Sequence, residues 1–383
     1  MNACSNVYVI GTDEAGYGPN LGPLLVGVSC WRVDLSKGNV EKERNYEKKI
    51  ASTLFDFVDE NEPTQISEDE YASCAVERLN VALAPTCARQ GVFPLVDSKV
   101  LYGASKSLAA LERSFWIAAC LTGARASDAS FQGVLRLTRE EPNASSPPWE
   151  RDVDFDAPVD SKTGNFSDLA ETASSVRGRL GELGVELLDL AARRVQPLEF
   201  NALLDNLGLK SELIADVTTS LLVETIARVV GRIEPTDVPL RFVALCDKLG
   251  GRDRYASILS ARFPGAIPCV VRESRASSVY RFQASSGRDR WGRVIDFSSS
   301  VILETHFTAK GESNAPTALA SIVAKYLREL SMRPFNEFWR RATGNDALRP
   351  TAGYPVDALR FRAEVEEAKR RLGVSDETFW RVK

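Results

Sequence analysis

Residues 7–23 read VYVIGTDEAGYGPNLGP and contain both the first strand candidate and the first candidate site. The apolar run at the start of this stretch predicts a buried strand that ends at residues 11–12. Asp13 and Glu14 follow in a segment dense in glycine and proline, which favours a turn. A second apolar run, residues 24–33, predicts the partner strand of a hairpin. The sequence therefore places two carboxylates where the first strand gives way to its turn.

Two later segments repeat this arrangement of an acid after a strand candidate. Asp247 ends the apolar run 240–246, and Glu312 follows the run 299–307. Strand ends that lie side by side bring their acids to one edge of a sheet, where several carboxylates repel one another unless cations lie between them. Because carboxylates are hard oxygen ligands, the pattern favours Mg²⁺ or Mn²⁺, and two such ions suit phosphodiester hydrolysis.

Each of these acids also has a simpler explanation when it is taken alone. Aspartate after a strand is common as a helix cap or a turn residue, which fits Asp247. Asp13 and Glu14 could equally belong to a solvated turn. Position at a strand end therefore leaves a metal site and ordinary turn residues as alternatives.

The alternation of strand and helix candidates along the 383 residues predicts an α/β fold, in which helices flank a mixed β-sheet. Hydrophobic residues recur at helical spacing in many segments after the opening hairpin. The expected helices cover residues 44–58, 68–84, 105–120, 169–207, 211–233, 254–263, 316–341 and 356–372, and the expected later strands cover residues 240–246, 267–273, 278–283 and 299–307.

The same pattern divides the chain into a core and insertions. A polar stretch that contains several prolines favours a long loop, and the leucine-rich stretch after it favours a helical insertion. The predicted core comprises residues 1–33, 93–138 and 236–383, and the predicted insertions comprise residues 34–92, the loop 139–166, the helical block 167–235 and a hairpin within the core at 275–300.

The predicted hairpin at 275–300 is basic and aromatic. Its arginines are interleaved with Tyr280, Phe282 and Trp291, and such a mixture can follow a nucleic-acid backbone. The alternative is a solvated hairpin whose aromatic side chains belong to the core, since exposed arginine is common.

Composition limits the classes of protein that need consideration. Charged residues make up 26% of the chain and hydrophobic residues 44%, as in ordinary soluble proteins. The net charge of −4 counts mildly against nucleic-acid binding, but phosphate contacts need only a local basic face. Seven cysteines without a CxxC pair, and a single histidine, argue against a zinc site and against a disulfide framework, which suits a reducing cytoplasm.

Targeting signals are not evident in the sequence. Residues 1–9 do not have the pattern of a secretory signal, and the longest apolar runs are too short to span a membrane. We therefore expect a cytoplasmic protein that has no membrane partner and no obligate protein partner.

Short motifs along the chain resemble, in the same order, those of the type 2 ribonucleases H. The first and fourth motifs are specific, whereas the second is short. A further Asp-Ser-Lys triplet at 160–162 lies in the polar loop without a leucine-bearing helix directly after it, and we interpret it as chance. The motifs are residues 11–19 with Gly22 and Pro23, Asp97-Ser98-Lys99, the strand that ends in Asp247, residues 310–313 with 320–325, and Gly353-Tyr354-Pro355.

The resemblance implies a ribonuclease H-like fold and a metal-dependent endonuclease. The implied substrate is an RNA–DNA hybrid, cut in its RNA strand, or a DNA duplex that contains ribonucleotides, and the implied products carry a 3′-hydroxyl and a 5′-phosphate. The catalytic and metal-binding carboxylates would be Asp13, Glu14, Asp247 and Glu312, around two Mg²⁺ or Mn²⁺ ions.

The resemblance also implies a set of substrate contacts. The main chain of Gly16-Tyr17-Gly18 would lie against a ribose 2′-hydroxyl, the group that distinguishes RNA from DNA. Tyr354 would stack on the sugar, and its alternative is a half-buried core tyrosine. The other implied contacts include three lysines at phosphates, whose alternative is ordinary solvated lysine; the set is Asp97, Ser98, Lys99, Lys310 and Lys325.

Three residues depart from the family pattern and motivate other functions. Tyr17 stands where the family usually has arginine or lysine, Lys248 where it has glycine, and Glu312 where it has aspartate. One alternative is a non-catalytic nucleic-acid-binding or scaffold module on the same fold. The other is a nuclease that acts on a different structured substrate.

Overall fold

A seven-stranded mixed sheet forms the centre of the molecule, in the order β3-β2-β1-β4-β9-β6-β5. The computed structural model describes residues 5–37, 71–88, 92–96, 98–103, 107–140, 146–309 and 314–382. The strands are β1 (Asn6–Ala15), β2 (Leu24–Asp34), β3 (Val185–Val195), β4 (Leu240–Asp247), β5 (Cys269–Glu273), β6 (Ser277–Ala284) and β9 (Val301–Thr308). Strands β7 (Gly287–Arg288) and β8 (Val294–Ile295) form a separate two-stranded hairpin.

The sheet is antiparallel at both sides and parallel in the middle. β1, β4 and β9 run parallel to one another, whereas β2 and β3 on one side, and β6 and β5 on the other, pair in antiparallel fashion. The predicted α/β fold, with a mixed sheet, flanking helices and an extra hairpin, is confirmed.

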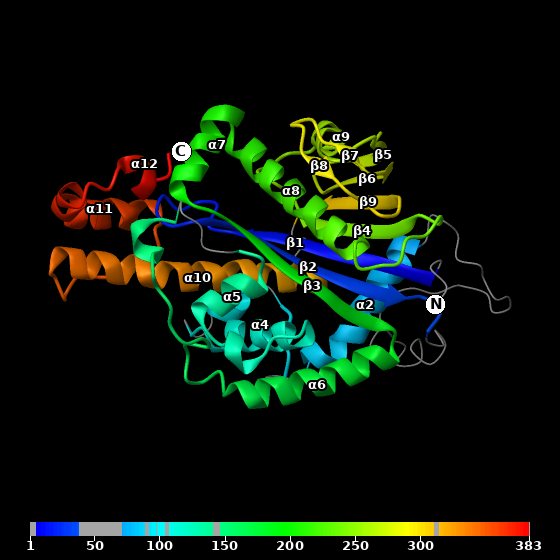
Figure 1. The fold of residues 1–383 in the computed structure, drawn as a ribbon, viewed down its shortest axis with the longest axis horizontal. Coiled ribbons are helices and arrows are strands. Elements are labelled where there is room, and N and C mark those ends of the chain that lie inside the picture. Colours follow the sequence, from blue (N-terminus) through cyan, green and yellow to red (C-terminus); the bar gives the residue numbers. More distant parts are fainter. Residues whose placement is uncertain are drawn as a thin grey trace.

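Helices cover both faces of the sheet (Figure 1). One face packs against α2 (Tyr71–Ala88), α4 (Ala109–Leu121), α6 (Phe166–Glu182) and α10 (Ala315–Thr343), and the other against α8 (Lys210–Val230) and α9 (Ala256–Arg262). The remaining helical segments are α3 (Ser98–Gly103), η2 (Ala126–Asp128), α5 (Phe131–Leu137), η3 (Pro148–Glu150), α7 (Pro197–Leu207), α11 (Pro355–Arg371) and α12 (Asp376–Phe379).

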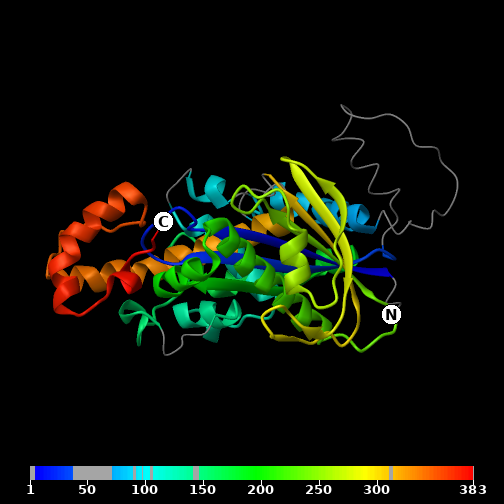
Figure 2. The ribbon, with the colours of Figure 1, turned by 90° about the horizontal axis from the view of Figure 1, so that it is seen from above.

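A third apolar cluster lies beyond the sheet. The second half of α10 extends past the strands and packs against α11 and α12 (Figure 2). Its largest side chains are Trp149, Phe335, Trp339, Phe361 and Phe379. This cluster fixes the C-terminal helices, and residues 353–354 before them, to the rest of the fold.

Two glycines allow α10 to lie directly on the sheet. A Cβ atom on Gly11 of β1 would lie 2.1 Å from the carbonyl carbon of Pro316, and one on Gly27 of β2 would lie 2.3 Å from the carbonyl oxygen of Ala320. Ser29 adds a hydrogen bond, since its hydroxyl donates to the Pro316 carbonyl at 2.8 Å. The backbone of α10 therefore rests on strand positions that only glycine can occupy.

The first strand is longer than the sequence pattern predicts. The prediction that it ends at residues 11–12 is wrong, because Asp13 and Glu14 pair with Gly27 and Val26 of β2 and the strand continues to Ala15. The two acids are thus held in extended, hydrogen-bonded backbone, and the turn begins after them.

The predicted continuous helix over 169–207 is also wrong. Residues 185–195 form β3, which pairs with β2 at the edge of the sheet. Gly184, with φ of +72°, follows the C-terminal end of α6 and breaks the helical run. The leucines that suggest a helix alternate across a strand instead. The division of the chain into a core and insertions stays a prediction, and the expected helix at 44–58 lies outside the described residues.

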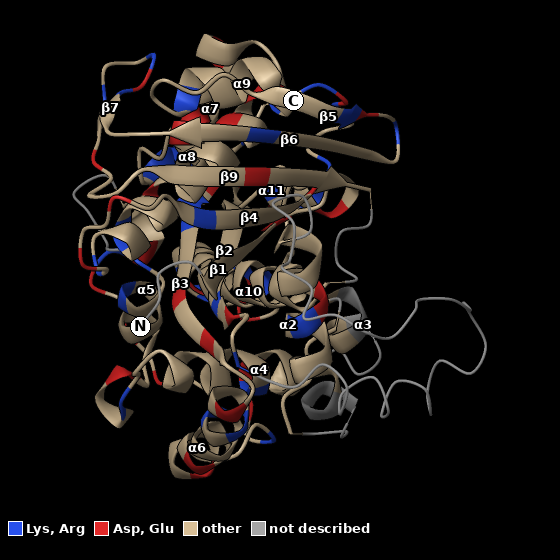
Figure 3. Ribbon diagram, turned by 90° about the vertical axis from the view of Figure 1, so that its right-hand side faces the viewer, with Lys and Arg blue, Asp and Glu red and all other residues tan. Residues whose placement is uncertain are grey.

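The arginine-rich hairpin contributes to the core. Tyr280 and Phe282 are buried, and the guanidinium of Arg281 bonds to Glu304 of β9 at 2.7 Å. Figure 3 shows the corresponding basic band on β6 beside an acidic band on β9. These contacts favour the simpler interpretation for Tyr280 and Phe282, whose rings are structural, whereas Trp291 is 50% exposed. Across the ranges that the structure describes, every helix is too short or too polar to cross a membrane.

Addition of a single methyl group at Gly11 should destabilise the fold strongly. A Gly11→Ala variant forces the added methyl group into the backbone of α10, so we expect a loss of about 1–3 kcal/mol or more in the free energy of unfolding, measured by urea denaturation. Gly178 is the matched control, because it lies exposed in α6 with no atom near its missing Cβ. Gly178→Ala should stabilise by about 0.5–1 kcal/mol. Equal effects at both positions would contradict the proposed contact.

Candidate functional site

Asp13 and Asp247 lie side by side on the neighbouring parallel strands β1 and β4. Thr12 of β1 is aligned with Cys246 of β4, and the two aspartates are the next residues on their strands. Because side chains alternate between the faces of a strand, both aspartates belong to the face that α10 covers. The structure therefore brings together two of the four predicted carboxylates.

The two aspartates lie near the start of α10 and differ in how deeply they are buried. Asp13 is 6% exposed, whereas Asp247 is half-buried and accepts the backbone N–H of Lys248 at 3.0 Å. Thr317 in the first turn of α10 donates to the carbonyl of Leu245 at 3.3 Å. The N-terminal end of this helix, where its dipole is positive, therefore lies over the strand ends and favours negative charge there.

Glu14 belongs to the opposite face of the sheet. Alternation along β1 directs it away from Asp13, toward the side on which α8 packs. Its negative charge contributes, after burial, to raising the pKa of the Tyr17 hydroxyl above the ordinary value. Glu14 is therefore a neighbour of Tyr17 in the turn.

Lys248 is directed away from the candidate site. Its ammonium donates to Asp253 at 2.6 Å and to the carbonyl of Ser274 at 2.6 Å. Lys248 thus connects the loop after β4 to the β5–β6 turn. It does not occupy the space between the strand-end acids.

Gly16 begins a turn whose conformation depends on glycine. Its φ is +84°, and a Cβ atom would lie 2.9 Å from the carbonyl oxygen of Pro23. Gly22, at the end of the turn, has φ of +74°. We call residues 16–23 the glycine turn.

Two buried arginines hold the glycine turn from below. Arg328 of α10 donates to the carbonyls of Pro23 at 2.8 Å, Leu21 at 3.4 Å and Ala352 at 2.7 Å. Arg381 donates to the carbonyl of Pro19. Sequence reasoning missed both residues. Arg328 could have been noticed as a charge on the apolar face of a long helix, whereas nothing local in the sequence distinguishes Arg381.

Tyr354 lies against the glycine turn with its ring largely exposed. The carbonyl of Gly353 accepts the N–H groups of Asn20 at 2.8 Å and Leu21 at 3.3 Å, which fixes residue 354 beside the turn. A Cβ atom on Gly18 would lie 4.0 Å from the Tyr354 ring, and the side chain of Tyr354 is 54% exposed. This exposure favours a contact role over a core role.

Of the other predicted contacts, Lys325 lines the same pocket as Arg328 and Tyr354, and three residues lie outside the described part of the chain. Ser98 is buried, with its hydroxyl 2.8 Å from that of Ser321, so it joins α3 to α10. Lys325 bonds to Glu329, and its ammonium lies 4.5 Å from the centre of the Tyr102 ring. Lys99 lies in α3. Asp97, Lys310 and Glu312 lie outside the described residues.

The donor set at the strand ends is compatible with a hard cation. Within the described ranges, no three His, Cys, Asp or Glu side chains gather as a metal site. The two aspartates nevertheless offer carboxylate oxygens, the ligands that Mg²⁺ and Mn²⁺ prefer. Glu312 lies in sequence between Thr308, which is aligned with Asp247, and Asn314, which precedes α10.

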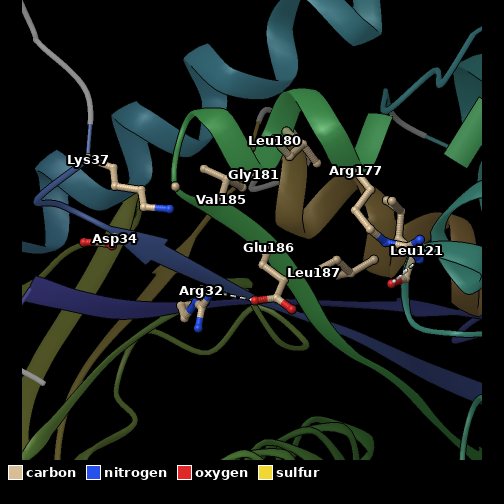
Figure 4. Close-up of a pocket in the computed structure, with 11 residues that line it drawn as sticks. Arg32, Asp34, Lys37, Leu121, Arg177, Leu180, Gly181, Val185, Glu186 and Leu187 are labelled. Carbon is tan, nitrogen blue, oxygen red and sulfur yellow. Dashed lines mark hydrogen bonds and ion pairs between the residues drawn. The ribbon is translucent and has the colours of Figure 1, made fainter. Parts of the chain in front are cut away.

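A separate small cavity lies at the opposite end of β2 (Figure 4). It has a volume of about 180 Å³ and contains an ion pair between Arg32 and Glu186 at 2.7 Å. Asp34, which also lines it, pairs with Asn6 at the start of β1. The cavity is therefore remote from the strand ends that carry Asp13 and Asp247.

Comparison with known proteins gives similarity to solved structures. No protein-family model matches the chain, and no curated protein matches it. The structure is similar to ribonuclease H2 from Pyrococcus horikoshii OT3, with 15% sequence identity, a TM-score of 0.31, and coverage of 97% of this chain and 92% of the other. It is also similar to Bst-RNase HIII in complex with Mn²⁺, with 15% identity, a TM-score of 0.35, and coverage of 98% and 66%. For RNase HII from Archaeoglobus fulgidus in its complex with PCNA, the identity is 13%, the TM-score is 0.31, and the coverage is 98% and 94%.

Removal of the Arg328 guanidinium should loosen the glycine turn and the fold around it. An Arg328→Met variant leaves three carbonyl oxygens without their donor, and each lost bond costs about 1 kcal/mol or more, so we expect a large fall in the urea midpoint. Arg333→Met is the matched control, because Arg333 is exposed on the same helix. A midpoint shift no larger than that of the control would show that Arg328 does not support the turn.

Proposed function

We propose that the protein is a metal-dependent endonuclease that cuts the RNA strand of RNA–DNA hybrids, or cuts at ribonucleotides embedded in duplex DNA. The observation that carries this proposal is the position of Asp13 and Asp247, each of which directly follows the last aligned pair of the parallel strands β1 and β4, next to the glycine turn. Acidic groups able to hold cations and a turn able to approach a sugar thus lie together.

Asp13 and Asp247 would hold a divalent cation, with Glu312 as a further ligand. Glu14, which the sequence motif assigns to the same set, lies on the opposite face of the sheet and is left out of this proposed set. When bound, Mg²⁺ or Mn²⁺ supplies an activated water and stabilises the oxygen that leaves phosphorus. The burial of Asp13 and the backbone hydrogen bond to Asp247 would keep the two carboxylates in place.

The glycine turn would recognise the ribose. Main-chain groups at Gly16 and Gly18 can approach a 2′-hydroxyl closely, because no side chain intervenes. The exposed ring of Tyr354 beside Gly18 would stack on the adjacent sugar. Arg328 and Arg381 would act as positioning residues that keep the turn in this conformation. The proposed products carry a 3′-hydroxyl and a 5′-phosphate.

Loss of the strand-end carboxylates should abolish cleavage. We expect Asp13→Asn and Asp247→Asn each to reduce cleavage of a labelled duplex by more than about 100-fold, because even residues that only orient metal ligands contribute up to about that much. The assay compares a full hybrid and a duplex with one ribonucleotide, each with Mg²⁺ and with Mn²⁺.

The matched control for this assay is Asp237→Asn. Asp237 is exposed just before the other end of β4, so its substitution should leave cleavage unchanged. Near wild-type cleavage by Asp13→Asn would contradict the proposed role. A wild-type protein that binds the duplex without cutting it under either metal would instead be a non-catalytic binding module, and cleavage restricted to another substrate would indicate a different nuclease.

A further inference from the structure

Lys210 places a cation beside the glycine turn from a distant part of the chain. It is the first residue of α8, and its ammonium lies 5.6 Å from the centre of the Tyr17 ring and 5.5 Å from that of Phe200. A cation held over two aromatic faces is restricted in position and attracted by both rings. The charge of Lys210 is therefore fixed next to Tyr17, which itself carries none at neutral pH.

Close packing joins the start of α8 to the turn. Gly250, in the loop after Asp247, has φ of +58°. A Cβ atom there would lie 2.7 Å from the Cβ of Ser211 and 3.2 Å from the hydroxyl oxygen of Tyr17. The glycine turn, the loop that follows β4 and the first residues of α8 thus meet at one point, so Lys210 belongs to the surroundings of the candidate site.

Arg381 adds a second cation to the same cluster. Its guanidinium lies 4.9 Å from the centre of the Phe200 ring, which the ammonium of Lys210 also contacts. The side chain is fully buried, and its Nε and Nη1 atoms have no hydrogen-bond partner among the described residues. Burial, and then the nearby charge of Arg328, lower the pKa of Arg381 to about 9.

The two acidic residues that follow Lys210 on α8 form ion pairs with arginines elsewhere in the fold. Glu212 bonds to Arg252, and Asp216 bonds to Arg262. Three long basic side chains, two of them buried, therefore place positive charge beneath and beside the turn, where Glu14 is the acidic neighbour of Tyr17. Nε and Nη1 of the buried Arg381 have no hydrogen-bond partner among the described residues, so an anion on the adjacent surface would offset part of the cost of burying this cation.

We propose that Lys210, with Arg381 and Arg328 behind it, forms a phosphate-binding site for a nucleic-acid backbone that passes over the glycine turn. Lys210 would supply a positive charge for a phosphate beside Tyr17, whose side chain is uncharged. The N-terminal end of α8, which begins at Lys210 without a side-chain cap, adds a favourable dipole. This inference rests on the proposed nucleic-acid substrate but does not require cleavage.

The test is the salt dependence of duplex binding by the full chain without added divalent metal. Dissociation constants of an RNA–DNA hybrid, and of a DNA duplex of the same sequence, would be measured over a series of salt concentrations. For Lys210→Gln we expect roughly tenfold weaker binding of both duplexes at low salt. The slope of log affinity against log salt should fall in magnitude by about 0.9, as for the loss of one phosphate contact.

Two further variants make the result specific. Lys210→Arg keeps the charge and should restore most of the affinity and the slope. Lys37→Gln removes an exposed lysine at the far end of β2, beside the small cavity, and should change neither quantity. Thermal unfolding of each variant would check that the fold is intact.

The outcomes separate this inference from the proposed function. If Lys210→Gln binds both duplexes as tightly as the wild-type protein, with the same slope of log affinity against log salt, the phosphate site alone is overturned. A reduced slope in a protein that never cuts either substrate would support the phosphate site and overturn the nuclease. Failure of the wild-type chain to bind either duplex would overturn both.

Discussion

The contact of α10 with the glycines of β1 and β2 is the constraint on which the rest of the structure depends. Because Gly11 and Gly27 lack side chains, the helix backbone lies directly on the sheet, and its axis is fixed relative to both strands. One end of the helix then lies over the strand ends that carry Asp13 and Asp247. Further along, Arg328 reaches the underside of the glycine turn. The close contact between the backbone of α10 and these two glycines thus fixes the positions of the aspartates and the glycine turn relative to each other.

Charge of opposite sign is separated across the candidate site. The strand ends carry aspartates, whereas the glycine turn rests on Arg328, Arg381 and Lys210. A polyanion passing over this surface would meet cations beneath its backbone and, next to them, acids able to recruit metal ions. The overall charge of −4 does not reveal this separation, because steering and binding depend on local potential.

The sequence was sufficient to locate β1, β4 and β9, because β1 and β4 are apolar runs and β9 alternates between buried and partly exposed residues. It was misleading for β3, whose leucines satisfy helical spacing as well as strand alternation and whose pairing with β2 is decided by tertiary contact. Asp13 and Asp247 were found from position after a strand. Lys210 and Arg381 could not be found that way, since their neighbours in space are Tyr17 and Pro19, far away in sequence.

The bracing of the glycine turn by Arg381 has a consequence for synthesis of the chain. Asn20 donates to the carbonyl of Arg381 across a separation of 361 residues, and the N–H of Arg381 returns a bond to Asn20. On a ribosome, the turn emerges before β3, whereas Arg381 emerges after all the strands of the sheet and after α10. The nascent protein therefore passes through a period in which its strands can pair but its turn lacks support. Such a delay would keep the recognition surface incomplete until nearly all of the described fold is available.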